Sequence, residues 1–411
     1  MNEGITPGTP GASSAPPARV AFSGENGEFR RLVTRGALLE LVTFGFYRFW
    51  LATNIRRHLW SNTSVEGDAL EYTGTARELL IGFLFALAIL VPIYLVYFVI
   101  GIEAERWQAF ASVPLGLFFY GFALFAVYRA RRYRLTRTLW HGVRFWMTGS
   151  GLAYALRALG WTFLTVLTLG LVYPWRAAAL EGYKMGHTFY GDLPGRFGGK
   201  GWDFFKRGWW LWLVALSLVA GLSGGVALSK KIAAPPAVGI VALVFVLVGV
   251  FAVPFIYAAF KATEWRWWVQ GLRFGHGPGG MRFDSDLRRG ALTGNIWKMI
   301  GVSLAVFAIV PLVGFINHGV MMALGIDTFK IVAGHKLPTI AFVIPMAVAY
   351  LATFLALGVV WRIYMVQRIW KLVVSSISIE NLDAADHVVA KGEAASAIGE
   401  GLADSLDVAG F

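Results

Sequence analysis

The chain has 411 residues, of which 57% are hydrophobic and 15% are charged, whereas about a quarter of the residues in a soluble domain are charged. This composition indicates a membrane protein, with 17 Trp and 31 Phe among the apolar residues. The absence of cysteine excludes disulfides, thiol redox chemistry, iron–sulfur clusters and cysteine-ligated zinc.

The first part of the chain begins with residues 1–20, which are rich in Pro, Gly, Ser and Ala and lack the apolar core of a signal peptide. We expect a disordered tail there. A strand-like segment at 19–29 follows, and then the apolar run "LVTFGFYRFW" within 36–50, which contains Glu40 and is short for a membrane span. Next come an alternating segment at 62–74 and two charge-free apolar stretches at 79–100 and 111–128. Each stretch is long enough to cross a hydrocarbon core of about 30 Å.

The middle of the chain shows the same sequence of elements. An alternating segment at 140–151 precedes a second apolar run, "VLTLGLVYPW", within 152–175, which holds Arg157 and is interrupted by Gly160, Gly170 and Pro174. The elements after it are a further alternating segment and two more expected spans, at 187–199, 208–229 and 237–260. The last third repeats the order in shorter form, with alternating segments at 270–284 and 375–382 around expected spans at 291–316 and 338–360.

The distribution of Lys and Arg predicts the orientation. The connections within the three expected hairpins of spans hold five basic residues, and the six segments expected on the other side of the membrane hold 29: 1–35, 51–78, 129–151, 176–208, 261–290 and 361–411. Because basic loops stay in the cytoplasm, both termini are expected there. The net charge of +13 then describes a cytoplasmic surface that attracts anionic lipids, and no nucleic-acid partner is needed to explain it.

The same rule bears on the two runs at 36–50 and 152–175. If both crossed the membrane, two segments with six basic residues each would lie outside. We therefore expect re-entrant or interfacial helices, packed between the spans. The alternative, eight spans instead of six, stays open.

The two runs belong to a longer internal repeat. Three of its positions match at a spacing of 125 residues: Thr43 with Thr168, Gly45 with Gly170, and Trp50 with Trp175. We predict membrane repeats at 21–150 and 151–289, and a partial third at 290–411 that ends in a cytoplasmic tail.

The expected fold class is an all-α polytopic membrane protein, three transmembrane hairpins with two duplicated re-entrant or interfacial helices. Period-two alternation bounded by Gly or Asn predicts strands in the cytoplasmic segments. We expect these strands to form a small cytoplasmic β component below the helices. For 270–284 and 375–382, Gly-rich connecting loops are an equal alternative.

No motif for catalysis, phosphate binding or metal binding is present, and the His residues lack metal-ligand spacing. We therefore expect no enzyme activity, no metal and no cofactor. The candidate binding residues, for lipid or solute, are the six matched positions of the repeat and two arginines of the run "YRARRYRLTRTLW": Thr43, Gly45, Trp50, Thr168, Gly170, Trp175, Arg132 and Arg134. The arginine run is equally explained as a cluster that holds a helix end in the cytoplasm.

The segments "TFGFYRFW", "TLGLVYPW", "EGYKMGHTFYGDLPGRFGG" and the closing "GEGLADSLDV" resemble the YjgN family of bacterial inner-membrane proteins, whose function is unknown. The resemblance implies an inner-membrane location and supplies no catalytic residues. We expect a non-enzymatic, lipid-interacting or envelope-associated module. The alternative is a transporter or channel for a small or amphipathic solute, which predicts a polar cavity beside the threonines and glycines of the two runs.

Overall fold

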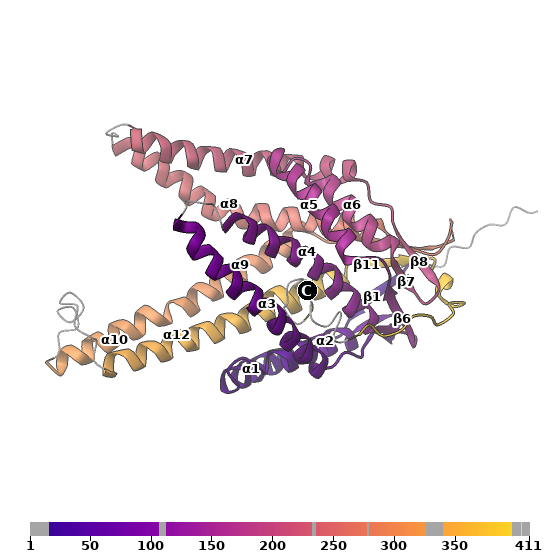
Figure 1. The fold of residues 1–411 in the computed structure, drawn as a ribbon, viewed down its shortest axis with the longest axis horizontal. Coiled ribbons are helices and arrows are strands. Elements are labelled where there is room, and N and C mark those ends of the chain that lie inside the picture. Colours follow the sequence, from indigo (N-terminus) through magenta and orange to yellow (C-terminus); the bar gives the residue numbers. More distant parts are fainter. Residues whose placement is uncertain are drawn as a thin grey trace, which may run out of the picture.

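The computed structural model describes residues 16–106, 112–231, 236–277, 279–325, 340–396 and 404. Within these ranges the order strand, helices, strand occurs five times (Figure 1). The first unit consists of β1 (Ala18–Phe22), α1 (Asn26–Val42), α2 (Arg48–Ser61) and β2 (Thr63–Val65). The second consists of β3 (Asp68–Ala69), β4 (Glu71–Tyr72), α3 (Ala76–Arg106), α4 (Ser112–Thr136) and β5 (Thr138–Trp140).

The third and fourth units follow the same order. The third consists of β6 (Val143–Met147), α5 (Gly151–Leu167), α6 (Tyr173–Gly186) and β7 (Thr188–Tyr190). The fourth consists of β8 (Leu193–Phe197), α7 (Gly201–Lys231), α8 (Pro236–Gly271) and β9 (Leu272–Phe274). The fifth is longer and comprises β10 (Met281–Ser285), α9 (Arg289–Phe307), α10 (Ile309–Ala323), α12 (Ile340–Trp361), a π-helix (Arg362–Arg368), α13 (Ile369–Val374) and β11 (Ile377–Glu380), before a 3-10 turn (Leu382–Ala385).

All the described strands belong to one antiparallel sheet of 11 strands, in the order β3-β2-β1-β11-β10-β9-β8-β7-β6-β5-β4. Only Leu70 separates β3 from β4, so the two ends of the order meet and the sheet is nearly closed into a barrel. Side chains from strands around the sheet form one buried cluster, which includes Trp140, Tyr190, Phe274 and Ile379.

The expected fold class is therefore wrong: the strands form an 11-stranded barrel-like sheet instead of a small β component in an all-α protein. Each alternating segment predicted from the sequence does contain a strand. Local alternation does not reveal that β1 pairs with β11, with Ala18 opposite Ile379. This pairing joins the first of the five units to the last. Long-range pairing of this kind turns separate hairpins into a closed sheet.

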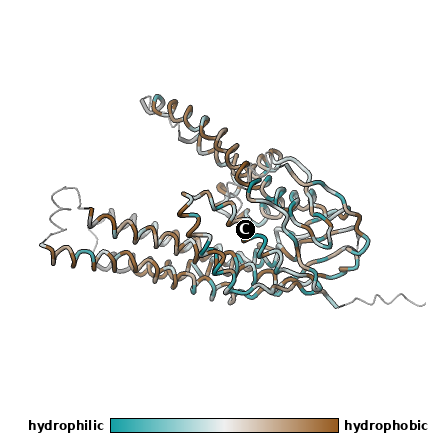
Figure 2. Tube along the Cα trace, turned by 90° about the horizontal axis from the view of Figure 1, so that it is seen from below, coloured by the Kyte–Doolittle hydropathy of each residue, from teal (hydrophilic) through white to brown (hydrophobic). Residues whose placement is uncertain are grey.

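The helices project from one side of the sheet, and Figure 2 shows them coloured as hydrophobic over most of their length. Among the described residues, four helices are long and apolar enough to cross a membrane: Ala76–Glu103, Leu247–Gly271, Arg289–Ala323 and Val343–Val374. Their outward surfaces expose many large apolar side chains. Six spans were expected. The other two, at 111–128 and 208–229, lie in α4 and α7, where some side chains are outside the described residues.

The runs at 36–50 and 152–175 each form the bend of a helix hairpin and not one continuous helix. In the first, α1 ends at Val42 and α2 begins at Arg48; in the second, α5 ends at Leu167 and α6 begins at Tyr173. The helices of each pair contact one another, so the chain turns back at its apolar run. Neither hairpin is among the four long apolar helices.

Candidate functional site

The bends of the two helix hairpins have the same backbone geometry. Phe44 and Leu169 both have a φ of 51°, and the glycines that follow, Gly45 and Gly170, both have a φ of 88°. Two consecutive residues with positive φ reverse the chain sharply, and glycine is the residue that adopts this conformation without strain. In each bend the glycine N–H donates to the backbone oxygen five residues earlier, at 2.7 Å.

The matched threonines cap the helices that end at these bends. Thr43 Oγ1 donates to the oxygen of Leu39 at 2.7 Å, and Thr168 Oγ1 donates to the oxygen of Leu164 at 2.8 Å. Each hydroxyl also accepts from a backbone N–H four residues later, at 2.9 Å in the first bend and 3.3 Å in the second. The Thr and Gly positions that match between the runs are therefore explained by the turn itself.

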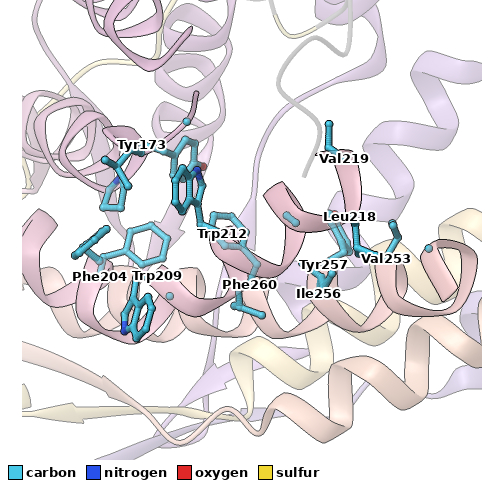
Figure 3. A pocket seen from close by; sticks show the side chains of 18 residues that line it. Tyr173, Phe204, Trp209, Trp212, Leu218, Val219, Val253, Ile256, Tyr257 and Phe260 are labelled. Carbon is cyan, nitrogen blue, oxygen red and sulfur yellow. The ribbon is translucent and has the colours of Figure 1, made fainter. Parts of the chain in front are cut away.

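An elongated apolar cavity of about 460 Å³ lies beside the second bend (Figure 3). Gly170 and Tyr173 border it at the bend, and the rest of the lining comes largely from α7 and α8. In Figure 3, Tyr173 and Phe204 lie toward one end and Val219 and Val253 toward the other. The stretch of α7 from Phe204 to Val219 corresponds to about 22 Å of helix.

The walls of this cavity are aromatic near the bend and aliphatic farther away. The aromatic part contains Tyr173, Phe204, Trp209, Trp212 and Phe260, and the aliphatic part contains Leu218, Val219, Val253 and Ile256. Trp212 Nε1 donates to the backbone oxygen of Leu169 at 2.9 Å, which ties α7 to the bend. A volume of this size is in the range of small-molecule sites, and its walls suit a hydrocarbon group.

The end of the cavity at Tyr173 adjoins charged groups. The Tyr173 hydroxyl donates to Glu264 at 2.5 Å, and Lys261 Nζ lies 2.6 Å from the same carboxylate. Lys206 and Arg207, both exposed, stand on α7 between the lining residues Phe205 and Gly208. The charged groups at this end are the Glu264–Lys261 pair, and Lys206 and Arg207 lie on the exposed surface of α7 outside the lining.

The first bend has different surroundings. A hollow of about 840 Å³ lies between α1 and α2, and its lining includes Glu28, Arg31, Arg35 and Asn54. Neither Thr43 nor Gly45 lines this hollow. The two bends share a backbone, and the hollows beside them differ, because charged side chains line the first and none lines the second.

The other predicted site residues lie apart from this cavity. Trp50 stacks on Tyr47, with ring centroids 6.3 Å apart, and Trp175 packs against Phe205 at 5.3 Å. Arg132 is half-buried on α4, and Arg134 Nε lies 3.4 Å from Oδ1 of Asp404. Of the eight predicted residues, the structure places Gly170 alone in the cavity lining.

Sequence reasoning missed a group of charged side chains on α2, α4 and α6, of which Arg56 is buried and the others are partly buried. Glu181 accepts from Lys184 and from Trp268 Nε1, and its Oε2 lies 3.8 Å from Nη1 of Arg131. Burial lowers the pKa of Lys184 below its ordinary value, with Glu181 opposing the effect. For Glu181, burial acts to raise the pKa, and the two cations outweigh it, so that the pKa is lowered.

The buried acid Asp404 was also missed, although it lies in the quoted closing segment "GEGLADSLDV". A lone acid near a chain end carries no signal of burial, and its partners are remote in sequence. Across the described ranges, no group of three or more His, Asp or Glu side chains is placed to hold a metal ion.

Comparison with known proteins identifies the family. No curated protein and no solved structure matches the chain. The family model described as "Bacterial protein of unknown function (DUF898)" matches residues 17–405, and the YjgN family is this same family, so the resemblance seen in the sequence is confirmed. The chain therefore belongs to the DUF898 family of bacterial proteins of unknown function.

Proposed function

We propose that the protein is a non-enzymatic, multi-pass module of the bacterial inner membrane that binds an anionic lipid. The hydrocarbon chain of the lipid lies in the apolar cavity between the α5–α6 bend and helices α7 and α8. The headgroup lies at the rim near Tyr173. The barrel-like sheet and both termini are on the cytoplasmic side.

The observation that carries this proposal is the cavity itself. Its lining from Phe204 to Val253 is aromatic and aliphatic, and it runs along helices whose outer surfaces are also apolar. Water gains little free energy from contact with such walls. A hydrocarbon chain gains about 25 cal/mol for each Å² of apolar surface that it buries there. An apolar cavity beside membrane-exposed helices is accessible to lipid.

Basic residues near the rim support an anionic headgroup. Lys206 and Arg207 are exposed and lie next to lining residues of α7. Basic residues close to a membrane surface contribute about 1 kcal/mol each to attraction for anionic lipids. The excess of Lys and Arg outside the hairpin connections supports the cytoplasmic placement of this rim.

The transport alternative has less support. It requires a polar path beside both bends, and the cavity at Gly170 has apolar walls. The hollow at the first bend is lined by charged and apolar side chains together, and its lining does not include Thr43 or Gly45. A path that joins the two bends is therefore not supported by these surroundings.

Two substitutions on α7 test lipid binding in the cavity. Leu218 lines the cavity, and Leu213 on the same helix is exposed outside the lining. Leu218→Trp fills the cavity and should reduce binding of phosphatidylglycerol about tenfold, as counted by native mass spectrometry of delipidated protein. Leu213→Trp adds the same side chain to the outer surface and should leave binding unchanged. Equal binding by the two variants would rule out the cavity as the lipid site.

A further inference from the structure

The α1–α2 hairpin carries polar residues that its copy lacks. The polar side chains in the lining of the hollow between its helices are Glu28, Arg31, Arg35, Tyr47 and Asn54. In the α5–α6 hairpin the residues 125 positions later are all small or apolar: Ala153, Leu156, Gly160, Val172 and Ala179. Because the two bends have the same backbone geometry, the hairpin forms without these polar groups. A role other than formation of the turn therefore accounts for them.

The two arginines of the lining lie on adjacent turns of α1. Arg31 and Arg35 are on one face of the helix, and both are exposed. Within the described part of the chain, no hydrogen bond or ion pair joins either guanidinium group to another residue. Like charges at this spacing repel one another, and an anion bound to both relieves the repulsion. Asn54 adds an amide donor from α2, so donors from two helices meet at the hollow.

The acids of α1 leave the lining positively charged. Glu28 also lines the hollow, and its Oε1 lies 3.8 Å from Nδ1 of His58 on α2. Glu40 lies outside the lining and pairs with Arg362 at 2.9 Å. Two arginines against one acid give the lining a net positive charge. Charge complementarity therefore favours an anion, and the planar donor fork of arginine suits phosphate.

The end of the hairpin next to this hollow is apolar. Leu38 and Leu39 line the hollow on the side of the bend, and Val42 beyond them is exposed. Phe44, in the bend, is 93% exposed, and its match in the second bend, Leu169, is 71% exposed. Both hairpins project from the sheet on the same side as the long apolar helices (Figure 1). Large apolar side chains exposed at the same place in both hairpins suit contact with hydrocarbon.

The pair between Glu40 and Arg362 indicates the depth of the first bend. Arg362 follows the last residue of α12, at the end of this apolar helix that is nearer the sheet. Charged groups of this kind lie at the edge of the hydrocarbon, where they reach the headgroups. Along α1, Arg35 and Arg31 lie about 8 and 14 Å nearer the sheet than Glu40. The arginines are therefore level with lipid phosphates, and the bend is level with the first part of the acyl chains.

We propose that the hollow between α1 and α2 binds the phosphate group of an anionic phospholipid, with Arg31, Arg35 and Asn54 as donors and the bend inserted among the acyl chains. The site rests on the membrane placement of the proposed function, and it is separate from the cavity at α7 and α8. The ligand is a lipid and not free phosphate, because Leu38, Leu39 and the exposed bend provide apolar surface for acyl chains.

Thermal unfolding in nanodiscs tests the phosphate site. Exchange of phosphatidylcholine for phosphatidylglycerol should raise the Tm of wild-type protein and of Leu218→Trp, whose cavity is filled. In both backgrounds Arg31→Gln and Arg35→Gln should each lose about half of this rise. Arg30→Gln removes the same charge from an exposed residue of α1 outside the lining and should keep the full rise. An equal rise in all three variants overturns the hairpin site, and it leaves lipid binding in the cavity to the separate test with Leu218→Trp.

Inorganic phosphate separates a lipid from a free anion. Added to discs of phosphatidylcholine, it should not reproduce the rise in Tm, because it has no acyl chains to place beside the bend. A rise with inorganic phosphate that is lost in Arg31→Gln would assign the hollow to a free anion and overturn the lipid as its ligand.

A single spin label tests insertion of the bend. The chain has no cysteine, so Phe44→Cys provides one attachment site for a nitroxide. In discs that contain phosphatidylglycerol, this label should be more accessible to oxygen, which concentrates in hydrocarbon, than to a water-soluble nickel chelate. Glu66→Cys, in an exposed turn of the sheet, should show the reverse. Equal access of the chelate to both labels would place the bend in water and overturn the proposal.

Discussion

The bends of the α1–α2 and α5–α6 hairpins have the same φ angles and the same Thr and Gly hydrogen bonds, and yet they border different surroundings. Beside Gly170, α7 and α8 enclose an apolar cavity. The first hairpin borders a hollow whose lining includes the charged residues Arg31 and Arg35, and Glu40 pairs with Arg362 at 2.9 Å. The matching Thr and Gly residues of the two runs therefore specify a turn. The helices next to each turn determine which side chains line the hollow beside it.

The largest expected difference concerns Glu181, which stands 125 residues after Arg56 and so gives the second hairpin an acid where the first has a base. Glu181→Gln removes the acid shared by Lys184 and Arg131, and loss of this partly buried partner costs about 1–3 kcal/mol. The free energy of unfolding, measured by denaturant titration in detergent micelles, should fall by that amount. Glu66→Gln in an exposed hairpin turn is the control and should have little effect. A loss below 1 kcal/mol for Glu181→Gln would contradict the assigned pairing.

The two bends should respond equally to loss of their glycines. Gly45→Ala and Gly170→Ala each place a side chain on a residue with a φ of 88°, at a cost of about 1–2 kcal/mol. No atom lies within 3.4 Å of the added methyl group at either position, so backbone strain should account for the whole effect. Gly182→Ala, in open space on α6, should stabilise the helix slightly. Clearly unequal losses in the unfolding free energy of the two bend variants would show that their backbones differ.

One hydrogen bond distinguishes the second bend. Trp212→Phe removes the donor to Leu169 O and should lower the unfolding free energy by about 0.5–1.5 kcal/mol. Trp209→Phe makes the same change in another cavity tryptophan and serves as its control. If the two substitutions have the same effect in denaturant titration, the bond to the bend does not contribute.

The smallest expected effect depends on pH and is confined to the first hairpin. Burial lowers the pKa of His58 below its ordinary value of 6.5, with Glu28 partly opposing the shift. The unfolded chain then binds the proton more tightly, so stability should fall as pH is lowered from 6.5 toward the pKa of the folded state, and this contribution should be constant above 6.5. The matched residue in the second hairpin is Tyr183, which has no imidazole. His58→Tyr should remove the decrease in Tm between neutral pH and about pH 5; an unchanged decrease would assign it to another group.

The elements were more predictable than their assembly. Alternation around Glu66-Gly67 and His141-Gly142 predicted strands, and the structure has them. In each case two strands are joined by a tight turn with two consecutive positive φ angles. Apolar length predicted the long helices. The closure of the sheet depends on pairing between β1 and β11, whose strength is not visible in either segment alone.

The site was predictable only in part. The spacing of 125 residues singled out Gly45 and Gly170 as candidate binding residues, and the structure places both in the turns between helices. The cavity arises from the approach of α7 and α8 to one bend, which no local pattern records. The pairing of Arg56 with Asp404 joins residues 348 positions apart, so neither residue signals the other.

The most direct test of lipid binding is an experimental structure of the protein in nanodiscs that contain phosphatidylglycerol. We expect elongated non-protein density between α7 and α8, running from Tyr173 to Val219, with its polar end at the rim beside Lys206 and Arg207. A structure in which these helices close on one another and the side chains of Trp209, Trp212 and Leu218 fill the space would contradict the account.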